Sequence, residues 1–182
     1  IGTDGSAIYT EDREASALLW LGSQAPVHLA EKFVLTTNFT PDFTGVEHLG
    51  FAGLRPTTIW VDGEQLVSDL LDEPSGDPFI GLMDPPYTSK PVNFVAGKTV
   101  EIKVELDMRN RQGMELFAAG TTFGFEPDKS NPQGLIDQAV ANAKAAELAI
   151  VVVGTNSKVE SEGFDRKSLK LPGAQDALVE AV

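Results

Sequence analysis

The sequence contains no cysteine and only two histidines, His28 and His48. Without cysteine there are no disulfides and no thiolate metal sites, and two histidines argue against a histidine-rich metal centre. Basic residues are also few, with 14 Lys and Arg against 27 Asp and Glu and a net charge of −13. Nucleic acids need a basic surface for their phosphates. We therefore expect no metal, no cofactor and no nucleic-acid partner.

Long apolar runs are absent as well. The longest, residues 148–153 (LAIVVV), has the length of a strand, whereas a bilayer-spanning helix needs roughly 20 apolar residues. No membrane partner is therefore expected. The acidic balance suits a neutral sugar, because carboxylates accept hydrogen bonds from hydroxyl groups; the alternative is that the charge serves solubility alone. The chain starts at Ile1 without a leader, so we expect its true start upstream, and secreted and cytoplasmic locations both stay open.

Residues 1–128 have the pattern of short antiparallel strands. Over residues 99–106 (TVEIKVEL), apolar and charged side chains alternate with period two, which is typical of a half-buried strand. Asp62-Gly63 stands between two strand-like runs and signals a hairpin. The expected strands are residues 32–39, 45–53, 57–61, 64–67, 92–95, 99–106, 114–119 and 122–125. Many short strands separated by turns predict a mainly β fold, an antiparallel β-sandwich.

Other features of this part receive structural interpretations. Trp60 lies within a β-rich run and is expected in the core. Arg109 and Arg111 follow a strand-like run and are expected to be solvated turn residues. Residues 72–88 (DEPSGDPFIGLMDPPYT) contain four prolines and are predicted to form a long surface loop. Loops of this kind on a rigid scaffold are where binding residues are concentrated.

Residues 129–182 follow a different pattern. Asn131-Pro132 is a helix start, because a capping side chain is followed by proline in the first turn. Residues 148–154 (LAIVVVG) form an apolar run that predicts a strand covered on both faces. A loop follows, and a second helical pattern begins at Ala174. The order helix, strand, loop, helix predicts an incomplete α/β segment that ends too early to close a sheet.

The loop of residues 156–172 (NSKVESEGFDRKSLKLP) concentrates groups that can bear chemistry. It follows the carboxyl end of the predicted buried strand, where open α/β sheets bind ligands. Glu160 and Glu162 lie two residues apart, and the glycine after Glu162 allows close backbone approach to a ligand. Asp165 and Arg166 can orient each other and sugar hydroxyls. The alternative is a charged surface loop with local salt bridges.

Two resemblances to known families follow from these motifs. AELAIVVVGTN with ESEGFDRKSLKLPGAQDALVEAV resembles the start of the C-terminal α/β domain of beta-glucosidases of glycoside hydrolase family 3, over residues 129–182. FAGLRPTTIWVDGEQLV and VNFVAGKTVEIKVEL resemble the PA-14 domain, over residues 1–128, cut at its N-terminus. A PA-14 insert directly before the α/β segment is the arrangement of a subgroup of family 3 enzymes.

The resemblance implies a fragment of a retaining beta-glucosidase that hydrolyses terminal non-reducing β-D-glucosyl residues, as in cellulose breakdown. Its nucleophile is an aspartate on an N-terminal (β/α)₈ barrel, and its acid/base is a glutamate on the α/β domain. The Glu-Gly-x-Asp-Arg match places the acid/base on Glu162, with Glu160 as the alternative. A barrel takes about 250 residues. It is therefore the partner that this chain lacks, and the chain alone is expected to hydrolyse nothing.

The resemblance also implies that the PA-14 module contributes to the leaving-group side of the active site. Phe79 and Tyr87 of the Pro-rich loop are then expected to stack on pyranose rings. No Asp-Asp pair of the kind that holds calcium in sugar-binding relatives is present. The expected ligand is a β-glucoside or a short β-linked oligosaccharide. The alternative function is a non-catalytic carbohydrate-binding β-sandwich.

Overall fold

The computed structural model describes residues 1–22, 24–53, 55–69, 87–126, 131–156, 159–160 and 163–182. Phe79 and Glu162 lie outside the described residues. The chain divides into two compact units, Ile1–Pro127 (unit 1) and Asp128–Val182 (unit 2). Each unit is described by itself.

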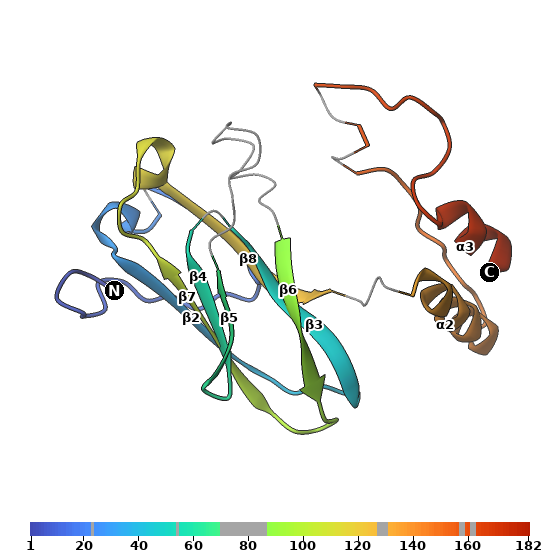
Figure 1. The fold of residues 1–182 in the computed structure, drawn as a ribbon, viewed down its shortest axis with the longest axis horizontal. Coiled ribbons are helices and arrows are strands. Elements are labelled where there is room, and N and C mark those ends of the chain that lie inside the picture. The colour runs from blue at the N-terminus through green and yellow to red at the C-terminus, as the bar shows by residue number, and fades with distance from the viewer. Residues whose placement is uncertain (23, 54, 70–86, 127–130, 157–158, 161–162) are drawn as a thin grey trace. The chain divides into compact units, whose positions relative to one another are not determined.

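The described residues of unit 1 form two four-stranded antiparallel sheets (Figure 1). The first contains, in spatial order, β1 (Ala17–Leu21), β8 (Ala118–Glu126), β3 (Gly45–Gly53) and β6 (Tyr87–Phe94). The second contains β2 (Lys32–Phe39), β7 (Val100–Asp107), β4 (Thr57–Val61) and β5 (Glu64–Asp69). A single cluster of buried apolar side chains draws on both sheets. The predicted mainly β sandwich is confirmed.

The core of unit 1 follows from the alternation seen in the sequence. In β7, Val100, Ile102, Val104 and Leu106 are buried, and the residues between them are exposed or half-buried. Strand β7 lies between β2 and β4, so its backbone groups are paired on both sides. Each such side chain contributes roughly 1.5–3 kcal/mol on burial. The two sheets are therefore held together mainly by apolar side chains in alternating positions.

Two close-range features fix the strand pairings. The hairpin between β4 and β5 turns at Asp62 and Gly63, whose φ angles are 49° and 80°. Positive φ at both positions is what a type I′ turn requires, so the predicted hairpin is confirmed. Gly50 lies opposite Ser89 in β6, and a Cβ on it would sit 1.9 Å from the Thr88 carbonyl oxygen. Only glycine lets β3 and β6 approach this closely.

Several expectations for unit 1 are wrong in detail. Residues 114–119 were expected as a strand, but the chain forms a 3-10 helix, η2 (Gly113–Leu116), before β8 begins. Strand β1 has no strong alternating pattern and was not predicted. Trp60 is half-buried rather than in the core, with Lys103 Nζ 4.5 Å from its ring centroid. Because Thr57 and Ile59 point inward, the period of two turns Trp60 to the outer face.

The two turn arginines have different environments. Arg109 is exposed, as expected, and pairs with Asp107 at 2.5 Å. Arg111 is half-buried, and the expectation of a solvated side chain is wrong for it. Its guanidinium donates to the carbonyls of Val27 and His28 in η1 (Val27–Leu29) and of Ala30 just after it. Burial lowers the pKa of Arg111. The Val27 carbonyl also accepts from the Ala30 N–H at 3.1 Å, and Arg111 adds a side-chain donor to this short helix from the loop after β7.

The described residues of unit 2 form two helices, α2 (Pro132–Ala145) and α3 (Gln175–Ala181). The predicted start of α2 is confirmed, because the Asn131 side chain accepts a hydrogen bond of 3.0 Å from the Gly134 N–H. Ile136 is the buried residue of α2. Among the described helices, none combines the length and the apolar character that a membrane crossing requires.

The strand expected over residues 148–154 is not formed. Leu148, Ile150 and Val152 are 76%, 81% and 87% exposed, and no pairing involves them. A strand needs neighbours that satisfy its backbone groups and cover its faces. The described residues of unit 2 contain no further strand that could do this. The strand predicted here is wrong, whereas the exposure of these side chains agrees with the prediction of an incomplete α/β segment that cannot cover such a strand.

Candidate functional site

Glu160 lies in the loop between residues 154 and 175, and two side chains hold its carboxylate. The Thr155 hydroxyl donates to Oε1, and Arg166 Nε lies 3.3 Å from Oε2. The backbone N–H groups of Val159 and Glu160 both donate to the Asn156 carbonyl, at 2.9 and 3.1 Å. The Arg166 and Glu160 side chains are 33% and 39% exposed. Glu160 therefore joins the two ends of the segment that runs from Thr155 to Arg166.

A second set of hydrogen bonds fixes the base of the same loop. Gln175, the first residue of α3, receives a 2.8 Å bond from the Gly154 N–H and donates to the Gly154 carbonyl at 2.9 Å. Its amide also donates to the Pro172 carbonyl at 2.9 Å. One side chain thus links the residues that enter and leave the loop. The loop starts and ends at fixed points of unit 2.

The structure brings together some of the predicted site residues. Glu160 and Arg166 form an ion pair. Asp165 is exposed, and no ion pair between Asp165 and Arg166 is found among the described residues. Glu162, the predicted acid/base, stands in the sequence within the segment that the Glu160–Arg166 pair spans. Its role stays a prediction.

Two residues of this site were missed from the sequence alone. Thr155 and Gln175 bear no charge and belong to no recognised motif. Gln175 reaches Gly154, which lies 21 positions away. Contacts of this range depend on how the loop folds back, and no local pattern in the sequence indicates them. A hydroxyl residue just after an apolar run was the only available signal for Thr155.

Tyr87, predicted to contact sugar, is the first residue of β6 in unit 1. Its hydroxyl donates to the Gly124 carbonyl at 2.9 Å, and the side chain is 38% exposed. Burial raises the pKa of the Tyr87 hydroxyl. Tyr87 and residues 122–126 line a hollow of about 390 Å³. The hydroxyl holds the ring against β8, and the sugar contact itself stays a prediction.

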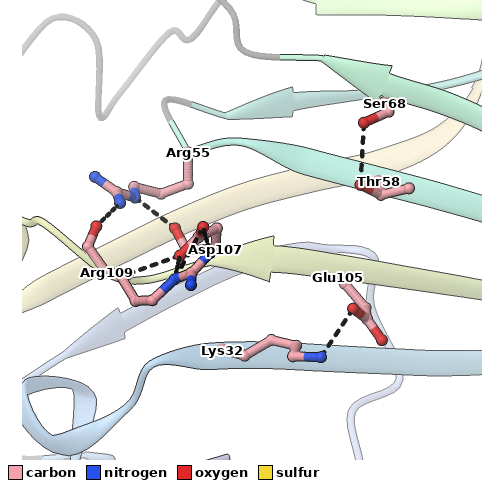
Figure 2. A network of polar contacts seen from close by, with 7 residues as sticks. All are labelled: Lys32, Arg55, Thr58, Ser68, Glu105, Asp107 and Arg109. Atoms are coloured by element: carbon pink, nitrogen blue, oxygen red, sulfur yellow. Dashed lines mark hydrogen bonds and ion pairs between the residues drawn. The ribbon is translucent and has the colours of Figure 1, made fainter.

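The outer face of the second sheet carries a polar network (Figure 2). Glu105 pairs with Lys32 at 3.1 Å and with Lys103 at 2.8 Å. Hydrogen bonds from the Arg109 side chain lower the pKa of Asp107 to about 2. The acidic and basic groups are paired with one another along the sheet. We interpret this network as a surface that stabilises unit 1.

Arg55 anchors the end of this network. Its Nε donates to the Asp107 carbonyl at 2.8 Å, and Nη1 lies 3.2 Å from the Glu115 carboxylate. Nη2 donates to the Arg109 carbonyl, as Figure 2 shows. Because Glu115 belongs to η2, Arg55 ties the loop after β7 to the loop before β4. These contacts hold the turn region after β7 in place.

The family model of the glycosyl hydrolase family 3 C-terminal domain matches residues 14–182. The chain belongs to this family. The match runs through both units and includes the loop that carries Glu160 and Glu162. It does not identify unit 1 as a PA-14 domain.

Relatives of this family 3 chain are fungal beta-glucosidases. Beta-glucosidase B of Emericella nidulans is 30% identical over 188 residues, which cover 100% of this chain and 21% of the relative. Probable beta-glucosidase H of Aspergillus clavatus is 30% identical over 156 residues, covering 81% of this chain and 18% of the relative. The chain therefore spans about a fifth of the length of the curated relatives it matches.

Solved structures agree on the fold. The selenomethionine-labelled beta-glucosidase of Kluyveromyces marxianus aligns with 100% of this chain and 22% of its own length, with a TM-score of 0.71 and 18% identity. The same enzyme in complex with glucose aligns with 83% of this chain and 17% of its own length, with a TM-score of 0.60 and 20% identity. Identity this low supports the shared fold alone.

Proposed function

We propose that this chain is part of a retaining beta-glucosidase and that Glu162 is its general acid/base. The observation that carries the proposal is the family 3 match, which extends through the loop with the sequence Glu162-Gly163-Phe164-Asp165-Arg166. The engagement of Glu160 by Thr155 and Arg166 supports the choice of Glu162. The beta-glucosidase names of the relatives support the substrate class.

The proposed chemistry has two steps. Glu162 protonates the glycosidic oxygen while a carboxylate of another domain attacks the anomeric carbon, and the bond to the leaving group breaks. Glu162 then removes a proton from the water that releases the sugar from that carboxylate. Retaining enzymes hold the two carboxyl groups about 5–5.5 Å apart. Asp165 and Arg166 are proposed to bind sugar hydroxyls at this position.

The nucleophile is proposed to come from a barrel domain outside this chain. General acid/base assistance alone contributes about 10²–10⁴-fold. Enzymatic acceleration as a whole typically reaches 10⁶–10¹⁷-fold, so one carboxyl group supplies a minor share of it. The isolated chain is therefore proposed to be inert. Unit 1 is proposed to be a PA-14 module whose residues Phe79 and Tyr87 contact the leaving-group side of a β-glucoside or short β-linked oligosaccharide.

The test compares leaving groups in a full-length protein that carries this chain. A general acid matters most when the leaving group is a poor one, because such a group departs only with a proton. Glu162→Gln should therefore reduce kcat/KM for alkyl β-glucosides by about 10²–10⁴-fold. It should largely spare kcat/KM for a dinitrophenyl β-glucoside, whose departure needs no proton, whereas kcat for this substrate should fall because the attacking water has lost its base.

Lys167→Gln, an exposed change in the same loop, serves as the control and should leave both substrates unaffected. Equal losses on both substrates, or none, would overturn the assignment of Glu162. A full-length protein that binds β-linked oligosaccharides without hydrolysing them would favour the non-catalytic binding module instead.

A further inference from the structure

We infer that Glu160 is a positioning residue whose carboxylate clamps Thr155 and Arg166 and thereby orients the Arg166 guanidinium. The inference rests on the proposed function. The clamp joins residues on both sides of Glu160, because Thr155 precedes Glu160 by five positions and Arg166 follows it by six.

The two carboxylate oxygens of Glu160 contact different side chains. Oε1 accepts a hydrogen bond from the Thr155 hydroxyl, and Oε2 lies 3.3 Å from Arg166 Nε in an ion pair. A glutamine side chain has one acceptor oxygen and one donor NH₂ group in place of these two oxygens, and it carries no charge. Glu160→Gln should therefore weaken the clamp.

The backbone reinforces the same geometry. Val159 and Glu160 both donate to the Asn156 carbonyl, which forms a tight turn directly before the carboxylate. The Gln175 amide separately fixes Gly154, the residue before Thr155. The Thr155 hydroxyl is thus supported from the Gly154 side, and Glu160 is supported by its own turn. Both groups that meet in the clamp are held in place by other contacts.

The clamp also orients Arg166. A guanidinium group has five N–H donors in a rigid plane, and its Nε lies 3.3 Å from Glu160 Oε2. Fixing that edge sets the plane of the whole group. The proposed contact of Arg166 with sugar hydroxyls therefore depends on Glu160. Loss of the clamp should misplace Arg166.

Misplacement of about 1 Å at a reacting centre can cost about 10²-fold in rate. In the full-length protein, Glu160→Gln should lower kcat/KM by about 10–10²-fold, equally for alkyl and dinitrophenyl β-glucosides. The basic limb of the pH profile should remain, because the acid/base is still present. This uniform loss differs from the leaving-group dependence expected for Glu162→Gln.

Thr155 provides the matched pair of variants. Thr155→Val removes the hydroxyl at nearly constant volume and should reduce kcat several-fold, whereas Thr155→Ser keeps the hydroxyl and should restore most of the activity. Hydrogen–deuterium exchange of the peptide over residues 155–166 gives a readout that is independent of catalysis. Exchange should rise in Thr155→Val and Glu160→Gln and stay near wild type in Thr155→Ser.

The outcomes distinguish the positioning role of Glu160 from the proposed catalytic role of Glu162. If Glu160→Gln shows the leaving-group dependence instead of Glu162→Gln, Glu160 is the acid/base and the positioning role is wrong. If Thr155→Val and Glu160→Gln change neither kcat nor exchange, the clamp does not position the loop. If the full-length protein lacks glycosidase activity but both variants raise exchange, the proposed function fails and the clamp stands.

Discussion

The two units contain similar apolar segments but bury them to different degrees. Val104 and Leu106 of β7 are 1% and 0% exposed, whereas Ile150 and Val152 of unit 2 are 81% and 87% exposed. The side chains are of the same kind, and the difference lies in their neighbours. Strand β7 has β2 and β4 beside it and the other sheet beneath it. An apolar run becomes a buried strand only where the chain supplies partners for it.

The largest expected effect comes from comparing one buried leucine of unit 1 with one exposed leucine of unit 2. Leu106→Ala removes a side chain that is 0% exposed and should lower the free energy of unfolding by about 2–5 kcal/mol. Leu148→Ala changes a side chain that is 76% exposed and should stay within about 0.5 kcal/mol of wild type. Urea denaturation followed by the fluorescence of Trp20 and Trp60 measures the change in unit 1, and far-UV circular dichroism of the helices α2 and α3 measures the change in unit 2. Equal losses would contradict the burial assigned to the two units.

A smaller effect is expected from two glycines of β3. A Cβ on Gly50 would lie 1.9 Å from the Thr88 carbonyl oxygen, whereas one on Gly45 would meet nothing within 4 Å. Gly50→Ala should therefore force β6 away and destabilise unit 1 by about 1–3 kcal/mol. Gly45→Ala is the matched control and should have little effect. Urea denaturation measures the free energy of unfolding of both variants. No change in Gly50→Ala would contradict the close pairing of β3 with β6.

The smallest effect concerns pH. The Arg109 hydrogen bonds lower the pKa of Asp107 from 3.8 to about 2. A lowered pKa in the folded state stabilises the protein above about pH 4, and that contribution is lost as the pH falls toward 2. The Asp107 side chain is 32% exposed, so solvent screening limits the contribution to about 1 kcal/mol.

Asp107→Asn should therefore lower stability at pH 6 and flatten its decline between pH 4 and pH 2. Asp12→Asn, an exposed change, is the control. Urea midpoints measured across this pH range provide the comparison. A wild-type slope in Asp107→Asn would show that this carboxylate makes no net contribution.

Strong local patterns were enough to predict much of unit 1. The alternation over β7 and the Asp62-Gly63 turn were predictable, because the side-chain direction in a strand and the φ angles in a turn depend on a few adjacent residues. The aromatic character of Trp60 predicts a core position, and this prediction is wrong. The inward direction of Ile59 turns its neighbour Trp60 to the outer face of the sheet. The strand over residues 148–154 failed for a different reason. Burial depends on neighbours that a local pattern does not contain.

The candidate site was predictable in composition but not in contacts. Charged residues at Glu160, Asp165 and Arg166 marked the loop, and the resemblance to family 3 gave them roles. The ion pair that forms joins Arg166 to Glu160, whereas the sequence suggested Asp165 as its partner. Adjacent residues seldom face each other, and a turn at Asn156 brings Glu160 within reach. Side-chain pairing in a loop follows from its fold rather than from proximity in sequence.

The most direct test of the central claim is rescue by azide in a full-length protein carrying this chain. Glu162→Gln removes the base that activates water, so the glycosyl–enzyme should persist until azide displaces the enzyme carboxylate and forms a C–N bond. Proton NMR of the product reads the anomeric configuration. The account predicts that azide restores turnover of a dinitrophenyl β-glucoside in Glu162→Gln with β-glucosyl azide as the product. Rescue of Glu160→Gln instead, or an α-configured azide, would contradict it.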